Sequence, residues 1–89
     1  MSRWSVAPDT VHTDLPDGSV VVLALGSKQY HTLNESAALV WRALAVQPRE
    51  TRELVELLVT EYEVEPETAR ADLERVLESW LGDGLARHP

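Results

Sequence analysis

Residues 29–44 read Gln-Tyr-His-Thr-Leu-Asn-Glu-Ser-Ala-Ala-Leu-Val-Trp-Arg-Ala-Leu, and this stretch decides the fold. Residues 29–33 form a short strand-like run, and Asn34 follows at once as a good helix N-cap. Four apolar residues then recur at the i, i+3, i+4, i+7 spacing of an amphipathic helix: Ala37, Val40, Trp41 and Leu44. Because almost no loop separates strand from helix, the stretch predicts a small sheet joined directly to a helical body.

Two further strands are expected before this stretch. Residues 10–14 alternate weakly between apolar and polar side chains. Residues 19–25 are β-branched and apolar almost throughout, as in a strand covered on both faces or central in a small sheet. The turns at 15–18 and 26–28 are short, so an antiparallel meander is the simplest topology. In that order the strand at 29–33 lies on an edge of the sheet.

A second helix is expected over about residues 52–63, after a first helix over about 35–46 that Pro48 ends. Thr51 can cap the second helix, and Glu53 suits its first turn. Its buried face is expected to hold four residues at helical spacing: Leu54, Leu57, Leu58 and Tyr62.

A third helix is expected from Pro66, which suits a first helical position, to about Leu81. Its inward residues are Ala69, Leu73, Val76, Leu77 and Trp80. Gly82 or Gly84 can then supply a left-handed residue, and Leu85 can tuck back as a closing contact. The expected fold class is therefore α+β, winged helix-turn-helix-like, with a three-stranded antiparallel sheet followed by three helices. Residues 1–89 make one domain, with an N-terminal arm over about residues 1–9.

Composition limits the class of protein. The chain has no cysteine, so disulfides and thiolate metal sites are excluded. No apolar run approaches the ~20 residues of a membrane span, and the N-terminus lacks the apolar stretch of a signal peptide. We therefore expect a cytoplasmic protein that does not contact the membrane.

The net charge of −7 argues against a nucleic-acid partner. All of the excess lies in residues 50–89, which hold eleven acids and four bases, against four of each in residues 1–49. Nucleic-acid binding draws much of its affinity from Lys and Arg on phosphates, which this half of the chain would repel. The third helix also has no Asn or Gln to recognise adenine.

The chain shows no pattern typical of catalysis, of a metal site or of a cofactor. His12 and His31 would lie two strands apart, at about 10 Å, which is too far to share a zinc ion. Ser36 has no glycine-rich elbow around it, and no glycine-rich phosphate loop is present. The acidic residues of 61–67 are those of a solvated helix end. We expect no catalytic residue, no metal ligand and no cofactor, and hence no enzyme.

Several motifs along the chain form a recognisable set. Asp17-Gly18 and an aliphatic strand precede Gly26-x-x-x-Tyr30-x-x-Leu33-Asn34-Glu35-x-Ala37-x-x-Val40-Trp41-x-x-Leu44. Tyr62-x-Val64-x-Pro66, Asp72-Leu73 and Leu81-x-x-Gly84-Leu85 follow. In this order they resemble the PqqD-like family over about residues 10–86.

The resemblance implies a precursor-peptide recognition element with no catalytic activity. Such domains bind the leader segment of a ribosomally made precursor peptide as a strand added to the third strand, against the third helix. The peptide-binding residues that this implies are Gln29, Tyr30, His31, Thr32, Leu33, Ala69, Asp72, Leu73, Arg75, Val76 and Trp80. Val76 is expected to line the groove, because Ala69, Leu73 and Leu77 already complete the inward stripe. An exposed edge strand could also pair with its own copy as a homodimer.

The resemblance leaves the pathway open. Quinone-pathway members, which chaperone a precursor to a radical enzyme, usually carry a Cys-Asp-Gly-like element where this chain has Pro16-Asp17-Gly18. That difference and the Arg-, Ala- and Val-rich composition favour lasso peptide biosynthesis, a class of antibiotic biosynthesis. There the expected partners are a precursor leader and a transglutaminase-like cysteine protease that removes it. The alternatives are the quinone-pathway chaperone and an acidic winged-helix protein that docks on another protein or regulates transcription.

Overall fold

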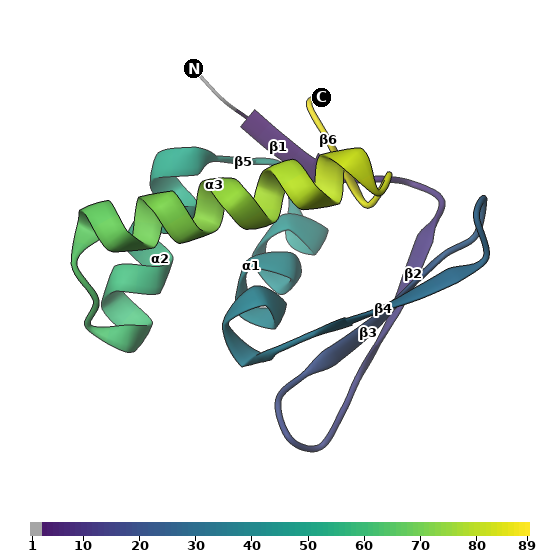
Figure 1. Cartoon of the computed structure of the whole chain (residues 1–89), viewed down its shortest axis with the longest axis horizontal. Coiled ribbons are helices and arrows are strands. Elements are labelled where there is room, and N and C mark those ends of the chain that lie inside the picture. The colour runs from purple at the N-terminus through teal and green to yellow at the C-terminus, as the bar shows by residue number, and fades with distance from the viewer. Residues whose placement is uncertain (1–2) are drawn as a thin grey trace.

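The meander folds as the sequence predicts, in a computed structural model that describes residues 3–89. Strands β2 (Thr10–Asp14), β3 (Val20–Ala24) and β4 (Gln29–Leu33) form an antiparallel sheet in the order β2-β3-β4. The expected α+β class with three helices is confirmed (Figure 1). The predicted edge position of β4 is also confirmed, because within the described residues β4 pairs with β3 alone.

The apolar strand β3 is the centre of this sheet and is not fully covered on both faces. Val20, Val22 and Ala24 are buried on the face toward the helices, whereas Val21 and Leu23 on the other face are only half-buried. The alternation follows from the pleat, which points successive side chains to opposite faces. The sheet therefore has one packed face and one open face.

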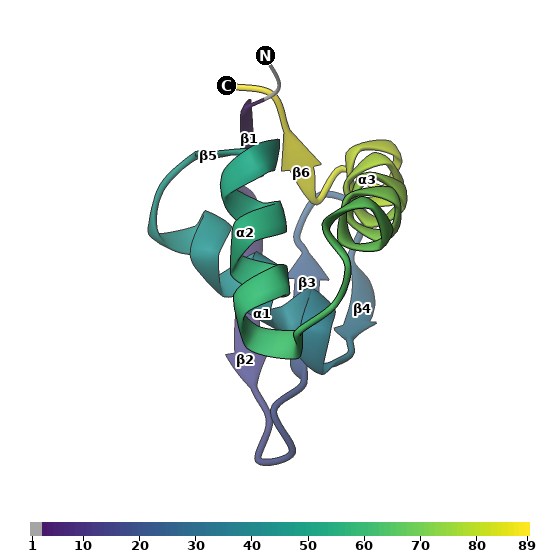
Figure 2. The ribbon, with the colours of Figure 1, turned by 90° about the vertical axis from the view of Figure 1, so that its left-hand side faces the viewer.

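Three helices gather on the packed face of the sheet, as Figures 1 and 2 show together. Helix α1 (Glu35–Val46) follows β4 directly, and α2 (Thr51–Tyr62) and α3 (Pro66–Gly82) complete the body. The Asn34 side chain caps α1 by accepting a hydrogen bond of 2.9 Å from the Ala37 N–H. This cap satisfies one of the free backbone donors at the helix start and holds the strand–helix junction in place.

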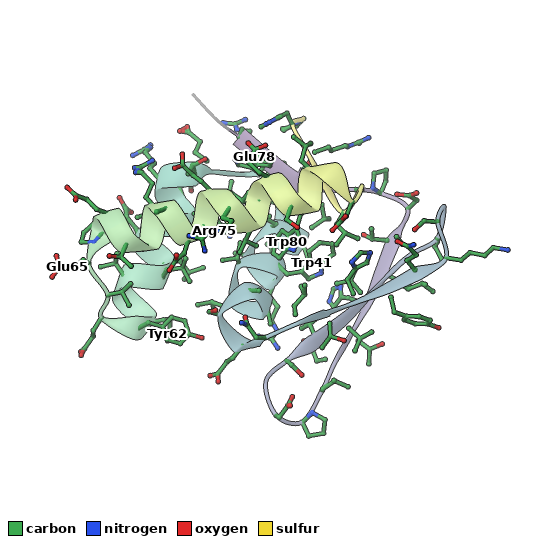
Figure 3. All side chains as sticks on the ribbon, viewed as in Figure 1. Trp41, Tyr62, Glu65, Arg75, Glu78 and Trp80 are labelled. Carbon is green, nitrogen blue, oxygen red and sulfur yellow. The ribbon has the colours of Figure 1, made fainter. Side chains whose placement is uncertain are left out.

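Trp41 lies at the centre of the core (Figure 3). It is 1% exposed, and its indole meets that of Trp80 edge to face, with ring centroids 5.5 Å apart. The expected closing contact at the end of α3 is confirmed, because Leu85 is buried and its N–H donates to the Trp80 carbonyl over 2.8 Å. Gly84 provides the left-handed residue, with φ of 76°.

The prediction of an N-terminal arm is wrong for the described part of residues 1–9; residues 1–2 lie outside the described range. Strand β1 (Arg3–Val6) pairs with β5 (Arg49–Glu50) on one side and with β6 (Ala86–Arg87) on the other. Trp4 is buried in the core cluster. This second sheet brings the two ends of the chain together, and its two-residue strands are too short to show a period in the sequence.

The prediction that Thr51 caps the second helix is also wrong. Glu50 is the N-cap, and its N–H donates to the Glu53 carboxylate over 2.9 Å. Thr51 is the first residue of α2, and its buried hydroxyl accepts a hydrogen bond of 3.0 Å from the Trp4 indole N–H. The hydroxyl thus serves the core contact between β1 and α2.

The prediction of the buried face of α2 is confirmed only in part. Leu54 and Leu58 are buried, but Leu57 is half-buried and Tyr62 is 39% exposed. The helix ends at Tyr62 because the next residue, Glu63, takes a left-handed conformation with φ of 51°. The chain turns toward α3 at this point, and Tyr62 is left beside a cavity instead of inside the core.

Candidate functional site

A cavity of about 560 Å³ lies between the end of β4 and helix α3. We call it the β4–α3 cavity. Its first wall comes from the strand–helix junction: Thr32, Leu33, Asn34, Ser36 and Ala37. Its second wall comes from one side of α3: Asp72, Arg75, Val76, Ser79 and Trp80. The open edge of β4 therefore borders a hollow whose far side is a helix.

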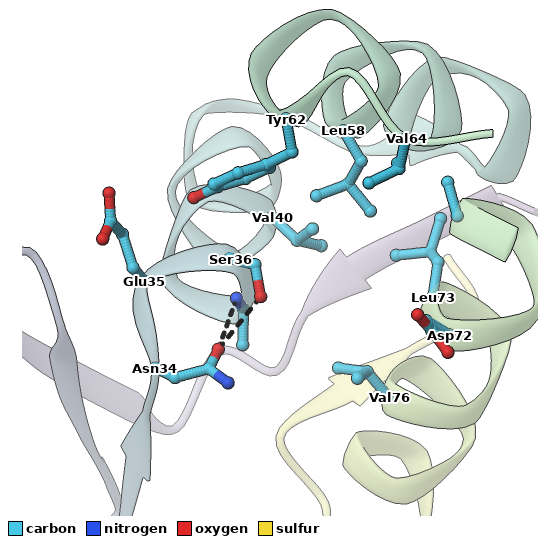
Figure 4. Close-up of a pocket in the computed structure, with 12 residues that line it drawn as sticks. Asn34, Glu35, Ser36, Val40, Leu58, Tyr62, Val64, Asp72, Leu73 and Val76 are labelled. Carbon is cyan, nitrogen blue, oxygen red and sulfur yellow. Dashed lines mark hydrogen bonds between the residues drawn. The ribbon is translucent and has the colours of Figure 1, made fainter. Parts of the chain in front are cut away.

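A second cavity, of about 470 Å³, adjoins the first and lies among the three helices (Figure 4). We call it the helical cavity. Six residues of its lining are apolar apart from one phenol: Val40, Leu58, Tyr62, Val64, Ala69 and Leu73. The two cavities share Asn34, Ser36, Ala37, Asp72 and Val76. Together they form a groove that leads from the sheet edge toward the turn between α2 and α3.

The wall shared by both cavities is held by hydrogen bonds at the start of α1. Asn34 Oδ1 accepts from the Ala37 N–H over 2.9 Å and from the Ser36 hydroxyl over 3.1 Å, as the dashed lines in Figure 4 show. Asn34, the residue that directly follows β4, therefore fixes the first turn of α1 through its side chain. These hydrogen bonds fix the position of the first turn of α1 relative to the end of β4.

Val76 stands where the two cavities meet on the side of α3. It is half-buried, whereas Ala69, Leu73 and Leu77 on the same helix are buried in the core. The spacing of apolar residues in this helix predicts the difference in burial, because Ala69, Leu73 and Leu77 complete its inward face without Val76. The structure confirms the position of Val76 at a cavity wall, and its contact with a peptide stays a prediction.

Charged groups stand at the rim of the groove. Asp72 and Arg75, one turn apart on α3, form an exposed ion pair with 3.4 Å between Oδ1 and Nη2. Glu35 lines the helical cavity on the opposite side (Figure 4). Figure 3 shows Arg75 on the stretch of α3 that leads to Trp80. An exposed pair of this kind contributes little stability, so these charges are available to a ligand at small cost.

The surroundings of the Tyr62 phenol raise its pKa. Burial raises its pKa most, and the carboxylates of Glu35 and Glu61 raise it further, while Arg42 acts in the opposite direction. Ionisation would place a third negative charge beside these two carboxylates. At neutral pH, which is far below the ordinary phenol pKa of about 10, the helical cavity presents a phenol O–H that can donate as well as accept a hydrogen bond.

Eight of the eleven peptide-binding residues expected from the sequence line these cavities: Thr32, Leu33, Ala69, Asp72, Leu73, Arg75, Val76 and Trp80. The side chains of Gln29, Tyr30 and His31 line neither cavity. Tyr30 lies on the open face of the sheet, since it is the register partner of Leu23. His31 lies on the packed face, as the register partner of Val22.

Sequence reasoning missed nine residues of the lining: Asn34, Glu35, Ser36, Ala37, Val40, Leu58, Tyr62, Val64 and Ser79. A signal for some of them was present. The Leu33-Asn34-Glu35 and Tyr62-x-Val64 motifs were noted, but as features of the family pattern and not as walls of a site. Their convergence depends on how α1 packs against α2 and α3, which no local pattern encodes.

The described residues offer neither a metal cluster nor a membrane-spanning element. Among residues 3–89, no three His, Asp or Glu side chains gather where they could hold a metal ion. His12 and His31 lie on β2 and β4, on either side of Val22. The helices in this range are too short or too polar to cross a bilayer.

Comparison with known proteins adds a family and two close folds. The family model for coenzyme PQQ synthesis protein D (PqqD) matches residues 19–86. The structure described as TbiB1 in complex with the TbiA(beta) leader peptide superimposes with a TM-score of 0.86 at 24% identity, covering 93% of this chain and 94% of that one. Lasso peptide synthetase B1 complexed with the leader peptide gives a TM-score of 0.81 at 27% identity, covering 94% and 96%. No curated protein matches the sequence.

Proposed function

Because this chain belongs to the PqqD family, we propose that it binds the leader segment of a ribosomally synthesised precursor peptide and presents it for lasso peptide maturation. The observation that carries the proposal is the groove of two cavities beside the unpaired edge of β4. Both structural neighbours are complexes with a leader peptide, which supports the same kind of ligand here.

The leader would bind by strand addition to β4. An edge strand leaves backbone N–H and C=O groups without partners in the sheet, and an extended peptide can pair with them. Because side chains alternate along a strand, every second residue of the peptide would point toward the β4–α3 cavity. Thr32 and Leu33 would border the added strand, and Val76 and Trp80 would receive its side chains from the other side.

The helical cavity would receive a larger apolar group from the same peptide. Its apolar lining and the neutral hydroxyl of Tyr62 suit an aromatic or cyclic side chain, such as the Tyr and Pro that lasso leaders commonly offer. Glu35 and Asp72 at the rim would favour a basic residue nearby in the leader. The partner that then receives the leader would be the pathway's leader peptidase, a transglutaminase-like cysteine protease.

The direct test is a titration of a labelled lasso leader peptide against wild type and Val76→Asp. A carboxylate at the junction of the two cavities should weaken binding at least tenfold, or by about 1.4 kcal/mol. Val46→Asp is the matched control, because Val46 is 76% exposed in the last turn of α1 and lines neither cavity. Equal affinity of Val76→Asp and wild type would refute the placement of the leader in this groove.

A second candidate function is that of a peptide chaperone in pyrroloquinoline quinone biosynthesis, which the description of the matching family model favours. The same groove would then hold a quinone precursor and present it to a radical enzyme. The two candidates separate by ligand, so the titration should include the lasso leader and a quinone-pathway precursor side by side. Tighter binding of the quinone precursor would replace the lasso assignment and would leave the binding mode unchanged.

A further inference from the structure

The packed face of β4 carries an imidazole beside apolar neighbours. The strand register places His31 opposite Val22 and Leu33 opposite Val20, and both valines are fully buried. The Nε2 atom of His31 is buried, and no group of residues 3–89 gives it a hydrogen-bond partner. Because a buried nitrogen without a partner is costly, an apolar side chain would suit this position of the fold better. Sequence rules are broken mainly at functional sites, so the imidazole points to a role outside folding.

The other ring nitrogen of His31 faces the end of helix α3. Its Nδ1 lies 4.0 Å from Oδ2 of Asp83, the residue that follows the last turn of the helix. This distance is longer than a hydrogen bond, and an ionic attraction arises only when the imidazole is protonated. The Asp83 side chain is 48% exposed, and within residues 3–89 no Lys or Arg forms an ion pair with it. The carboxylate is therefore open to a cation from another molecule.

The contact between His31 and Asp83 lies just beyond the Trp80 end of the β4–α3 cavity. The lining of that cavity includes Thr32 and Leu33 on the strand side and extends to Trp80 on the helix side. His31 is the next residue back along β4, and Asp83 is three residues beyond Trp80. The same gap between strand and helix therefore changes along its length from an apolar wall to a polar pair.

A leader strand added to β4 would present its side chains to these two environments in turn. Residues directly opposite each other on neighbouring strands point to the same face of a sheet. The leader residue opposite Leu33 would therefore meet the apolar wall that includes Val76. The leader residue opposite His31, two positions away, would meet the imidazole and the Asp83 carboxylate.

We propose that His31 and Asp83 form a subsite that selects a basic residue of the leader, Lys or Arg, two positions from the apolar residue that faces Leu33. The proposal rests on the proposed function. An ammonium or guanidinium group can donate charge-assisted hydrogen bonds to the Asp83 carboxylate. An acidic leader residue would be repelled, since the chain carries a net charge of −7. An apolar leader residue would cover the carboxylate without giving it a partner.

The test uses a labelled lasso leader peptide and two sets of variants, in which each position in turn carries Lys or Glu. One position should prefer Lys to Glu at least tenfold in affinity for wild type. Asp83→Asn keeps the shape of the side chain and removes its charge, so it should reduce this preference to about twofold or less. Glu78→Gln is the matched control and should leave the preference unchanged. It removes the same charge from an exposed position of α3, on the side of the helix away from Trp80 (Figure 3).

His31→Leu provides a second variant with the opposite expectation. The substitution removes the unpaired Nε2 and makes the strand side of the subsite apolar. The leader position that prefers Lys in wild type should then accept Leu at least as well as Lys. A role of His31 in folding alone would change the free energy of unfolding and would leave the preference at this leader position as it is in wild type.

The outcomes separate the subsite from the proposed function. If wild type does not bind the leader, the proposed function fails and the subsite fails with it. If the leader binds and no position shows a Lys preference that Asp83→Asn removes, the subsite proposal fails and the proposed function stands. A Lys preference that Glu78→Gln lowers as much as Asp83→Asn would assign it to the overall negative charge of the chain and would overturn the subsite.

Discussion

The indole N–H of Trp4 donates a hydrogen bond of 3.0 Å to the hydroxyl oxygen of Thr51, although the two residues lie 47 positions apart in the chain. The contact joins β1 to the first residue of α2, and both side chains are buried. The bond lies beside the small sheet of β1, β5 and β6, because Trp4 belongs to β1 and Thr51 directly follows β5. We therefore expect the bond to stabilise the contact between β1 and the start of α2.

Replacing Thr51 by Val tests the contribution of this bond. The substitution keeps the volume and removes the acceptor, so the buried indole N–H loses this partner at a cost of about 1–3 kcal/mol. Urea unfolding followed by tryptophan fluorescence gives the free energy. Thr51→Ser keeps the hydroxyl and should recover most of the loss. An unfolding free energy of Thr51→Val equal to that of wild type would show that the bond adds nothing to stability.

Local patterns predicted the parts of the fold that have a period or a cap. Asn34 is the clearest case, because its position between a strand and an apolar 3.6-residue period indicates its role before any tertiary contact is known. Thr51 misled for the same reason: its residue type suits a cap, but its hydroxyl accepts a hydrogen bond from the distant Trp4 indole. The strands that pair with β1 are set by such distant contacts and leave no local trace.

The residues that α3 contributes to the candidate site could be predicted from the sequence, whereas those of the opposite wall could be predicted less well. Counting the inward stripe of α3 sufficed to separate Val76 from its buried neighbours. The opposite wall comes from Tyr62, whose helical spacing suggested a core position, and from Val64, which was expected in the link between the second and third helices. Their exposure to a cavity depends on the left-handed turn at Glu63, which leads the chain away from α1. A left-handed residue that is not glycine gives little warning in the sequence.

The division between core and groove on α3 predicts opposite effects of two truncations. Leu77 is fully buried, so Leu77→Ala should cost about 2–5 kcal/mol of unfolding free energy by opening a cavity in the core. Val76→Ala removes fewer atoms from a half-buried site, and it should cost about 1 kcal/mol or less while it weakens leader binding. Chemical denaturation and leader titration of both variants check the two effects. A larger loss of stability in Val76→Ala than in Leu77→Ala would reverse the assignment of the two residues.

The raised pKa of Tyr62 predicts that the contribution of this residue to folding stability changes only in strongly alkaline solution. Its pKa is raised in the folded chain by burial and by Glu35 and Glu61, so folding favours the neutral phenol. The resulting stabilisation is complete below the ordinary phenol pKa of about 10 and is lost as pH rises through the raised value. Titration by the ultraviolet absorbance of phenolate should show a late component that Tyr62→Phe removes. Retention of that late component in Tyr62→Phe would contradict the raised pKa of Tyr62.

Strand addition predicts a two-residue period in the backbone of the bound leader. Successive N–H groups of a strand point to alternate sides, so only every second leader N–H would donate to β4. A set of leader peptides, each with one N-methyl group, should therefore alternate between affinities reduced at least tenfold and affinities close to that of the unmodified peptide. Fluorescence titration of the set against the wild-type chain measures the pattern. A loss that recurs every three or four residues would indicate a helical leader in the groove, and an unchanged affinity throughout would exclude backbone pairing with β4.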